Sequence, residues 1–184
     1  MEGTKKLEDE LFDASPEELY TFLKSLARRA KAYGWDDENL GTFQIPEDSL
    51  IHNSPTRSLI DNYGSITLAN VKEFDEGYLF NQLRAAQDNT IIFQCLMNSL
   101  TSTGRKKLQV LEKEYTIENP AIAGEYEMSA NALLKIIIRV SHIDTKATTA
   151  TIKMKLQSLD KYILTIACDI DKFNMHVNLL LESL

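Results

Sequence analysis

Proline and glycine are scarce in this chain, with 4 and 7 of them among 184 residues. A fold built on many close β-turns uses more of both, so their scarcity favours helices. No apolar run approaches the roughly 20 residues that a membrane helix needs, and "MEGTKKLEDELFD" lacks the apolar core of a secretory signal. We therefore expect an intracellular, cytoplasmic protein without a membrane partner.

Cysteine and clustered basic charge are also limited. Cys95 and Cys168 both lie in apolar helical patterns, where we expect buried thiols in a reducing compartment. The net charge is −7, whereas binding to nucleic acid needs clustered lysine and arginine. The basic groups at 28–31 and 104–107 are interpreted as solvated helix faces. The sequence thus predicts at most an indirect association with RNA.

Motifs of catalysis are missing from the sequence. It contains no GxGxxG, GxxxxGK[ST], GxSxG or HExxH. Its histidines (His52, His142 and His176) are scattered. The stretch "DIDKFN" does not fit a calcium loop, because Phe173 takes the third ligand position and a helical pattern surrounds it. We predict no catalytic, cofactor-binding or metal-binding residues, no cofactor, and a protein that is not an enzyme.

What the sequence does contain is helical periodicity. Residues 15–34 have Ser15 as a candidate cap, Pro16 at the first helical position and Gly34 as a stop. Residues 35–65 are expected to be loop with one short helix near 56–62. Further helices are predicted over 65–74 with Ser65 as the cap, over 78–100, and over 101–115 with hydroxyl caps. A loop is expected at about 117–127.

Two interpretations remain open for part of the next segment. Residues 129–142 are rich in β-branched side chains, so a strand at 136–140 is an alternative to a helix. We favour a helix because Ser129 is a good cap and no partner strands are evident. A long segment follows, with Asp144 as its expected cap. As one helix, 145–184 would be about 60 Å long, so a break near 157–160 is considered.

An apolar stripe runs through residues 156–184. Its members are Leu156, Leu159, Ile163, Ile166, Ile170, Phe173, Val177, Leu180 and Leu184. Steps of alternately three and four residues are typical of a coiled coil, and also of a helix packed in a bundle of its own chain. Complementary charges beside the stripe are missing, and further leucines widen it. We therefore favour the bundle over the self-paired coil.

The predicted fold class is all-α, a multi-helix bundle with a long C-terminal amphipathic helix or helix pair. Residues 1–13 are expected to be a flexible N-terminus. Residues 14–184 are expected to form one helical domain, or two subdomains that meet near 117–127. Since the chain ends in a run of leucines, we interpret it as a fragment of a longer polyprotein.

Several stretches resemble the Gag-like capsid region of copia-type LTR retrotransposons, over about residues 15–184. They are "RAKAYGW" followed by "FQIP", then "NSL…LQVLEKEYT", and the closing segment 156–184. A W-x-x-L-x-x-x-Y helix is frequent in that family. Here Leu108 stands in place of the tryptophan, followed by Leu111 and Tyr115. No CCHC zinc knuckle follows.

The resemblance implies a structural protein that self-assembles into particles around element RNA through helix–helix contacts. Its partners would be other copies of itself or the downstream segment of the same polyprotein. The candidate interaction surface is Leu180, Leu181 and Leu184, which an intramolecular core would also explain. The alternative function is a monomeric helical adaptor module that binds a partner helix in a groove between its own helices.

Overall fold

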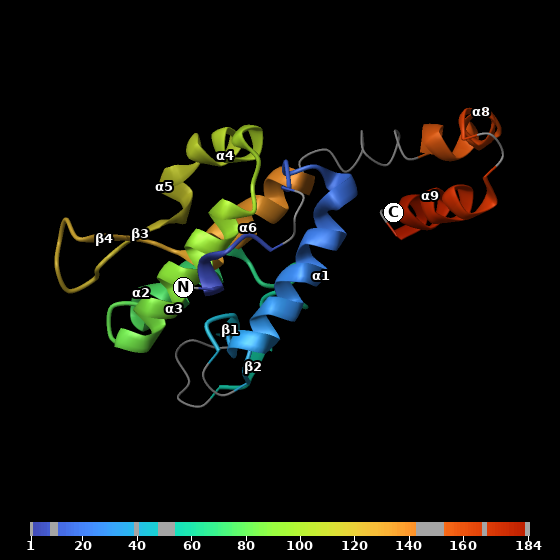
Figure 1. The fold of residues 1–184 in the computed structure, drawn as a ribbon. Coiled ribbons are helices and arrows are strands. Elements are labelled where there is room, and N and C mark those ends of the chain that lie inside the picture. The colour runs from blue at the N-terminus through green and yellow to red at the C-terminus, as the bar shows by residue number, and fades with distance from the viewer. Residues whose placement is uncertain are drawn as a thin grey trace.

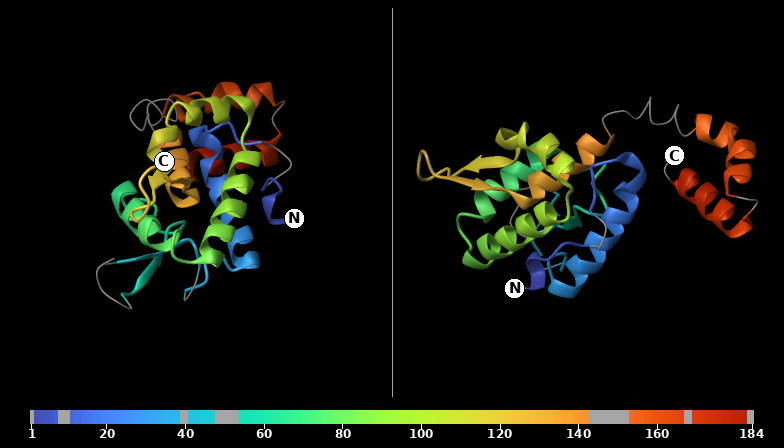
Figure 2. Two further views of the ribbon diagram at one scale, coloured as in Figure 1. Left: turned by 90° about the vertical axis from the view of Figure 1, so that its left-hand side faces the viewer. Right: turned by 45° about the horizontal axis from the view of Figure 1, so that its top comes forward.

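The computed structural model describes residues 2–7, 11–38, 41–47, 54–142, 153–166 and 169–182. They are mostly helical, as predicted (Figure 1). Two small antiparallel sheets, which were not predicted, accompany the helices. Two parts are visible: a body formed by residues up to 142, and an arm formed by 153–182 (Figures 1 and 2).

Helix α1 (Pro16–Tyr33) ends as its sequence predicts. Gly34 adopts a left-handed conformation at φ 72°, and its N–H donates to the carbonyl of Ala30. Glycine suits that position because it has no Cβ to clash. At the other end, Ser15 occupies the capping position, but its side chain makes no capping hydrogen bond, unlike our expectation.

Helix α6 (Ala130–His142) is the centre of the body, and nine of its thirteen residues are buried. It contacts α1 and each of the helices α2 (Leu68–Tyr78), α3 (Leu83–Asn98), α4 (Ser102–Gln109) and α5 (Glu112–Tyr115). Ser129 Oγ accepts from the N–H of Ala132 at 2.8 Å, so the predicted cap is confirmed. The strand alternative at 136–140 is wrong, because neighbouring helices bury this segment on several sides.

Residues 35–65 contain a small sheet in place of the expected short helix near 56–62. Strand β1 (Gln44–Pro46) pairs antiparallel with β2 (Thr56–Ser58). Polar side chains reinforce the pairing: Thr56 Oγ1 donates to Gln44 Oε1 at 3.0 Å, and Ser58 Oγ donates to Asp36 Oδ2 at 2.9 Å. The prediction failed because these partners lie 12 to 22 residues apart, beyond the reach of a local pattern.

Three of the predicted helices are differently bounded. The cap of α2 is Thr67, which forms a reciprocal capping box with Asn70, and not Ser65. The hydroxyl cap predicted for α4 is confirmed, since Thr101 Oγ1 accepts from the N–H of Gly104 at 3.0 Å. Helical structure is interrupted at 79–82 and again at 110–111, so the helices predicted over 78–100 and 101–115 are shorter than expected.

The expected loop at 117–127 is a hairpin. Strand β3 (Thr116–Glu118) pairs antiparallel with β4 (Tyr126–Met128), and the hairpin projects from the body (Figure 1). Ile117 anchors its base in a small apolar cluster with Leu79 and Ala85. The base of the hairpin therefore packs against the body.

The N-terminal segment, which we expected to be flexible, packs against the body. Its short 3-10 helix η1 (Glu2–Thr4) contacts α3. Phe12 forms a parallel bridge with Leu100 and stacks on Phe22 at 4.5 Å between ring centroids. Arg29 also contributes, because its guanidinium donates to the carbonyls of residues 5 and 6. Arg29 is therefore more than part of a solvated face.

Candidate functional site

The arm carries the apolar stripe, divided between short helices. Residues 153–157 are helical, Ser158 is a turn, and α8 (Leu159–Thr165) and α9 (Ile170–Glu182) follow. The first interruption falls inside the interval where we considered a break, and a second lies at Ile166. The described part of the segment is thus a series of short helices and not one long rod.

Side chains hold α8 and α9 together within the arm. The rings of Tyr162 and His176 stack with their centroids 4.0 Å apart. Asp169 begins α9, since its Oδ1 accepts from the N–H of Lys172 at 3.1 Å. That hydrogen bond, with the Lys172 ammonium 3.3 Å from Oδ2, lowers the pKa of the Asp169 carboxyl. "DIDKFN" thus contains the start of a helix.

The described members of the stripe are only partly covered. None of the arm side chains that the structure describes is buried, including the stripe members from Leu156 to Val177. Leu164, Ile170 and Met175 are 73%, 67% and 66% exposed. Leu164 lies on α8, and Ile170 and Met175 lie on α9. Several large apolar side chains exposed in one part of a protein indicate an interaction site more often than an accident of packing. The arm is therefore the candidate functional site.

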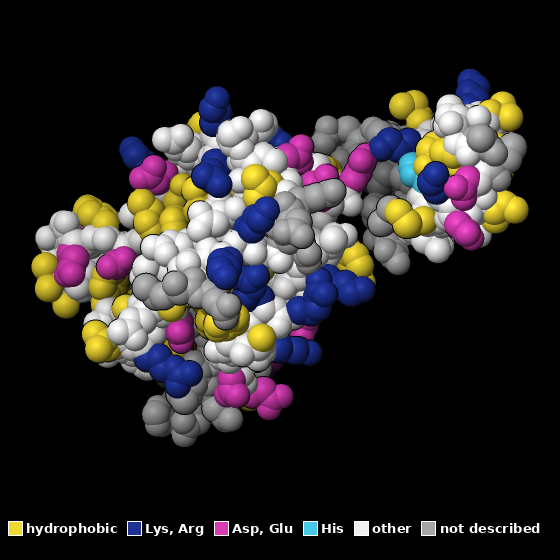
Figure 3. Space-filling view, viewed as in Figure 1, with side chains coloured by type: hydrophobic (Ala, Val, Ile, Leu, Met, Phe, Trp, Pro, Cys, Tyr) yellow, Lys and Arg dark blue, Asp and Glu magenta, His cyan; other side chains and the backbone are white. Residues whose placement is uncertain are grey.

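The arm touches the body over a small region. Helix α9 contacts α1, and the Lys155 ammonium forms an ion pair with the Glu17 carboxylate. Both groups of this pair are exposed enough for water and salt to screen their attraction. These contacts leave the apolar side chains of α8 and α9 accessible, as Figure 3 shows on the upper right.

The predicted interaction residues fall at the end of the arm. Leu180 and Leu181 belong to α9 by their backbone, but their side chains lie outside the described part of the structure, and so does Leu184 altogether. On α8 and α9 the most exposed large apolar side chains are Leu164, Ile170 and Met175. Ile170 belongs to the predicted stripe, whereas Met175 was not singled out from the sequence. Alternation of hydrophobic and polar residues could not separate them from core positions, because exposure depends on which neighbours the fold supplies.

A second cluster, buried in the body, was not predicted from the sequence. The Asp75 carboxylate on α2 accepts from Ser129 Oγ and, at 2.9 Å, from Asn131 Nδ2. The Asn131 amide also donates to the carbonyl of Thr42 at 2.9 Å. Nearby, Asn89 Oδ1 accepts from the N–H of Ala130 at 2.7 Å. These polar groups connect α2, α3 and the start of α6.

Burial sets the electrostatics of that cluster. Removal from water raises the pKa of Asp75 to about 7, and the hydrogen bonds from Ser129 and Asn131 oppose the shift only in part. Perturbed carboxyl groups often mark active sites, provided a substrate can reach them. Asp75, Ser129 and Asn131 have no exposed surface. We therefore assign the cluster a structural role.

Other expected features have mixed outcomes. Cys95 is buried, as predicted, and burial raises the pKa of its thiol. Cys168, His52 and the expected cap Asp144 lie outside the described residues. The described residues contain no group of three or more His, Cys, Asp or Glu side chains placed to hold a metal. Within the same residues, no helix is both long and apolar enough to cross a membrane.

Comparison with models of protein families, with curated proteins and with solved structures found no match to this chain.

Proposed function

We propose that this chain is a self-assembling structural domain of the Gag-like capsid type, which forms particles around element RNA through helix–helix contacts. The observation that carries the proposal is the arm, whose described apolar side chains are all at least partly exposed. The likeness of residues 15–184 to the copia-type capsid region supports the same function.

The arm gains most from a partner that covers its apolar side chains. Full burial of one large aliphatic side chain is worth about 1.5–3 kcal/mol, and three of them are more than half exposed on α8 and α9. Two helices that pack together can complete a four-helix bundle with the same pair from another copy. Leu180 and Leu181 belong to α9 by their backbone and stay part of the proposed contact surface.

Charge favours another arm as that partner. The arm has four basic and four acidic residues: Lys153, Lys155, Lys161, Lys172, Asp160, Asp169, Asp171 and Glu182. The net charge of −7 therefore resides entirely in the rest of the chain. Two bodies repel each other at close range, whereas two arms meet without net repulsion. An arm-to-arm contact also separates the acidic bodies.

Sedimentation velocity over about a hundredfold range of concentration tests the proposal. The chain should sediment faster as its concentration rises. The variant Ile170→Asp/Met175→Asp places charges on the proposed surface and should lose the part of the association that the arm provides, with unchanged helix content by circular dichroism. The matched control Gln157→Asp/Asn178→Asp adds the same charge at exposed polar positions of the arm and should associate like the native chain.

A native chain that stays monomeric throughout would contradict assembly through the arm. That result would favour the alternative, a monomeric adaptor whose arm or groove binds a helix of another protein. If the control and the Ile170→Asp/Met175→Asp variant lose association equally, the effect is one of added charge and not of the apolar surface.

A further inference from the structure

A strip of basic side chains lies on the body, away from the arm's apolar surface. Lys24, Arg28 and Lys31 follow one another at helical spacing on α1 and are exposed. Arg29 donates to the carbonyls of Lys5 and Lys6 at 2.7 and 2.9 Å, and thereby holds these two exposed lysines beside the helix. We call these six residues the basic strip. The sequence has no acidic residue between Glu18 and Asp36.

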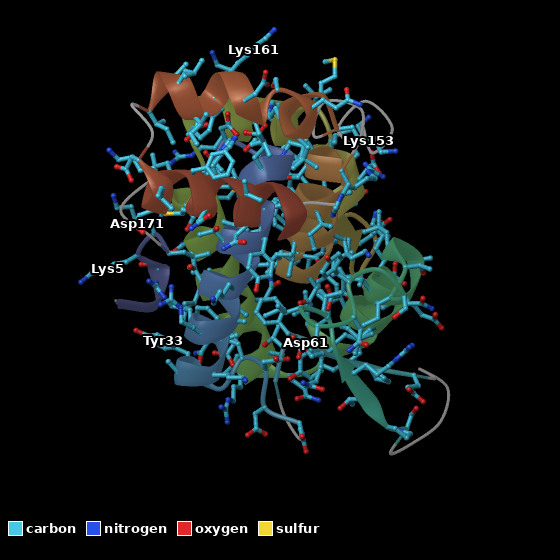
Figure 4. All side chains as sticks on the ribbon, turned by 90° about the vertical axis from the view of Figure 1, so that its right-hand side faces the viewer. Lys5, Tyr33, Asp61, Lys153, Lys161 and Asp171 are labelled. Carbon is cyan, nitrogen blue, oxygen red and sulfur yellow. The ribbon has the colours of Figure 1, made fainter. Side chains whose placement is uncertain are left out.

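Two exposed tyrosines flank the basic strip. The Lys24 ammonium lies 5.9 Å from the ring centroid of Tyr20, and Tyr33 stacks against Trp35 at 5.2 Å. Figure 4 shows Lys5 and Tyr33 along the same edge of the molecule. The surface thus combines positive charge with two exposed aromatic side chains.

The β3–β4 hairpin has the opposite charge. Residues 116–128 contain three glutamates and no lysine or arginine. Its apolar side chains Ile122 and Tyr126 are 57% and 60% exposed. Glu118 is paired with Tyr126 across the two strands, so both side chains lie on the same face of the hairpin. This face therefore presents a carboxylate and an aromatic ring together.

Hydrogen bonds within the hairpin fix its shape. Glu118 Oε1 accepts from the N–H of Gly124 at 3.0 Å, and Asn119 Nδ2 donates to Glu125 Oε2 at 2.7 Å. The backbone of Ala121 donates to Asn119 Oδ1 at 2.9 Å. A preorganised protrusion loses less conformational entropy when it binds than a loose loop would.

We infer that the basic strip of one copy binds the β3–β4 hairpin of a second copy of this chain. The inference rests on the proposed function, because it supplies a second contact for the same assembly. The hairpin and α1 lie on opposite sides of the body (Figures 1 and 3), so one chain cannot satisfy both surfaces by itself. Glutamates meet lysines and arginines in the contact, and Tyr126 and Ile122 meet Tyr20 and Tyr33.

Assembly geometry explains why a second contact is needed. Two arms that pair as equals close on themselves and produce only a dimer. A contact between two different surfaces leaves one of each unoccupied at the ends, so it continues into rings or extended arrays. The hairpin offers a small surface, which is typical of a weak contact. Weak contacts add up when an assembly repeats them.

The test uses the full chain carrying Ile170→Asp/Met175→Asp, which removes the arm contact. In this background, the strip variant adds Lys24→Glu/Lys31→Glu, and the hairpin variant adds Glu118→Lys/Tyr126→Ser. Sedimentation of each variant alone should show self-association weakened at least about tenfold. An equimolar mixture should form a one-to-one dimer and nothing larger, because only one intact strip can meet one intact hairpin.

The control is Glu76→Lys, which makes the same charge change as Glu118→Lys at an exposed position of α2 and should associate like the background chain. A mixture that does not restore the dimer overturns the inference. A second result would also overturn the inference: the strip variant loses binding to a single-stranded RNA oligonucleotide, while the hairpin variant self-associates normally. The basic strip would then bind a polyanion and not the hairpin.

The experiments distinguish failure of the strip–hairpin contact from failure of assembly through the arm. The arm contact is measured with strip and hairpin intact, and the strip–hairpin contact is measured with the arm contact removed. A chain that dimerises through its arm but shows no complementation between the two variants retains the first proposal and loses the second.

Discussion

Asp75 shows how a single residue connects three parts of the body. Its carboxylate has no exposed surface and accepts hydrogen bonds from Ser129 and Asn131, at the start of α6. Ser129 in turn accepts from the N–H of Ala132 at 2.8 Å, so the same hydroxyl caps α6 and binds Asp75. A buried polar group is costly unless it forms hydrogen bonds, so these hydrogen bonds favour one arrangement of the helices that they join.

The Asp75 pKa makes the stability of the body dependent on pH. The folded-state pKa of about 7 exceeds the ordinary value of 3.8, so the folded chain holds a proton that the unfolded chain releases. The stabilising contribution is complete below pH 3.8, falls as the pH rises, and is lost above about 7. A shift of this size corresponds to about 4 kcal/mol.

We therefore expect Asp75→Asn to flatten this dependence. The unfolding free energy of the native chain should fall relative to the variant by about 2–4 kcal/mol between pH 4.5 and pH 8. Urea unfolding at a series of pH values measures the difference. Asp61→Asn, at an exposed position, is the control and should follow the native curve. Parallel curves for native chain and Asp75→Asn would refute the assigned shift.

At the scale of elements, α6 and α9 have equal length and opposite surroundings. Each spans thirteen residues with apolar side chains at helical spacing. Five helices surround α6, whereas none of the described side chains of α9 is buried. Most of a helix's stability in a protein comes from packing of its apolar face and not from propensity. The body can therefore hold α6 firmly, and α9 depends on a partner.

Hydrogen exchange should reveal this contrast. In dilute solution, the amides of α6 should exchange only on global unfolding, while those of α8 and α9 exchange at least about a hundredfold faster through local opening. At high concentration, protection should rise in the arm and remain constant in α6. The Ile170→Asp/Met175→Asp variant is the control, since its arm should gain no protection. Equal protection of α6 and α9 in dilute solution would contradict the assignment.

At the scale of the whole molecule, charge is segregated between surfaces. The chain carries 27 acidic and 20 basic residues, yet the arm is neutral, the basic strip is positive and the hairpin is negative. Segregated charge on a compact body favours particular orientations when two copies approach. The apolar arm and the charged surfaces should therefore respond differently to the solvent.

Salt should separate the two contacts. Raising the ionic strength from about 0.05 M to about 0.5 M shortens the screening length to a few ångströms and weakens contacts between exposed charges. We expect larger assemblies to dissociate into dimers, which persist because burial of apolar surface is not screened. Light scattering over a salt series measures this, with the hairpin variant in the native-arm background as a control that forms dimers at every salt concentration. Dimers that dissociate in salt before the larger assemblies do would contradict the scheme.

Several elements could be predicted from local sequence. Pro16 and Gly34 bound α1, and Ser129 begins α6, because capping and backbone conformation depend on residues a few positions apart. The small sheets could not be predicted in this way. The pairing of Ile45 with Arg57 and of Ile117 with Glu127 depends on which segments the body brings together.

For the candidate site, too, some features could be predicted from the local sequence and others could not. The periodic stripe from Leu156 to Leu184 was legible in the sequence, because the spacing of apolar residues is a local property. The partial exposure of its described members was not legible, since a helix packed inside a bundle has the same spacing as one whose partner lies elsewhere. The cluster around Asp75 and the opposite placement of strip and hairpin likewise involve residues far apart in the chain.

The sequence by itself determined that the chain is largely helical and where α1 and α6 begin or end, because these depend on local periodicity and capping. Only the tertiary structure decided which apolar faces are covered. Burial is a property of neighbours, and the fold supplies them to α6 from five helices while it leaves α8 and α9 with exposed side chains such as Leu164 and Ile170.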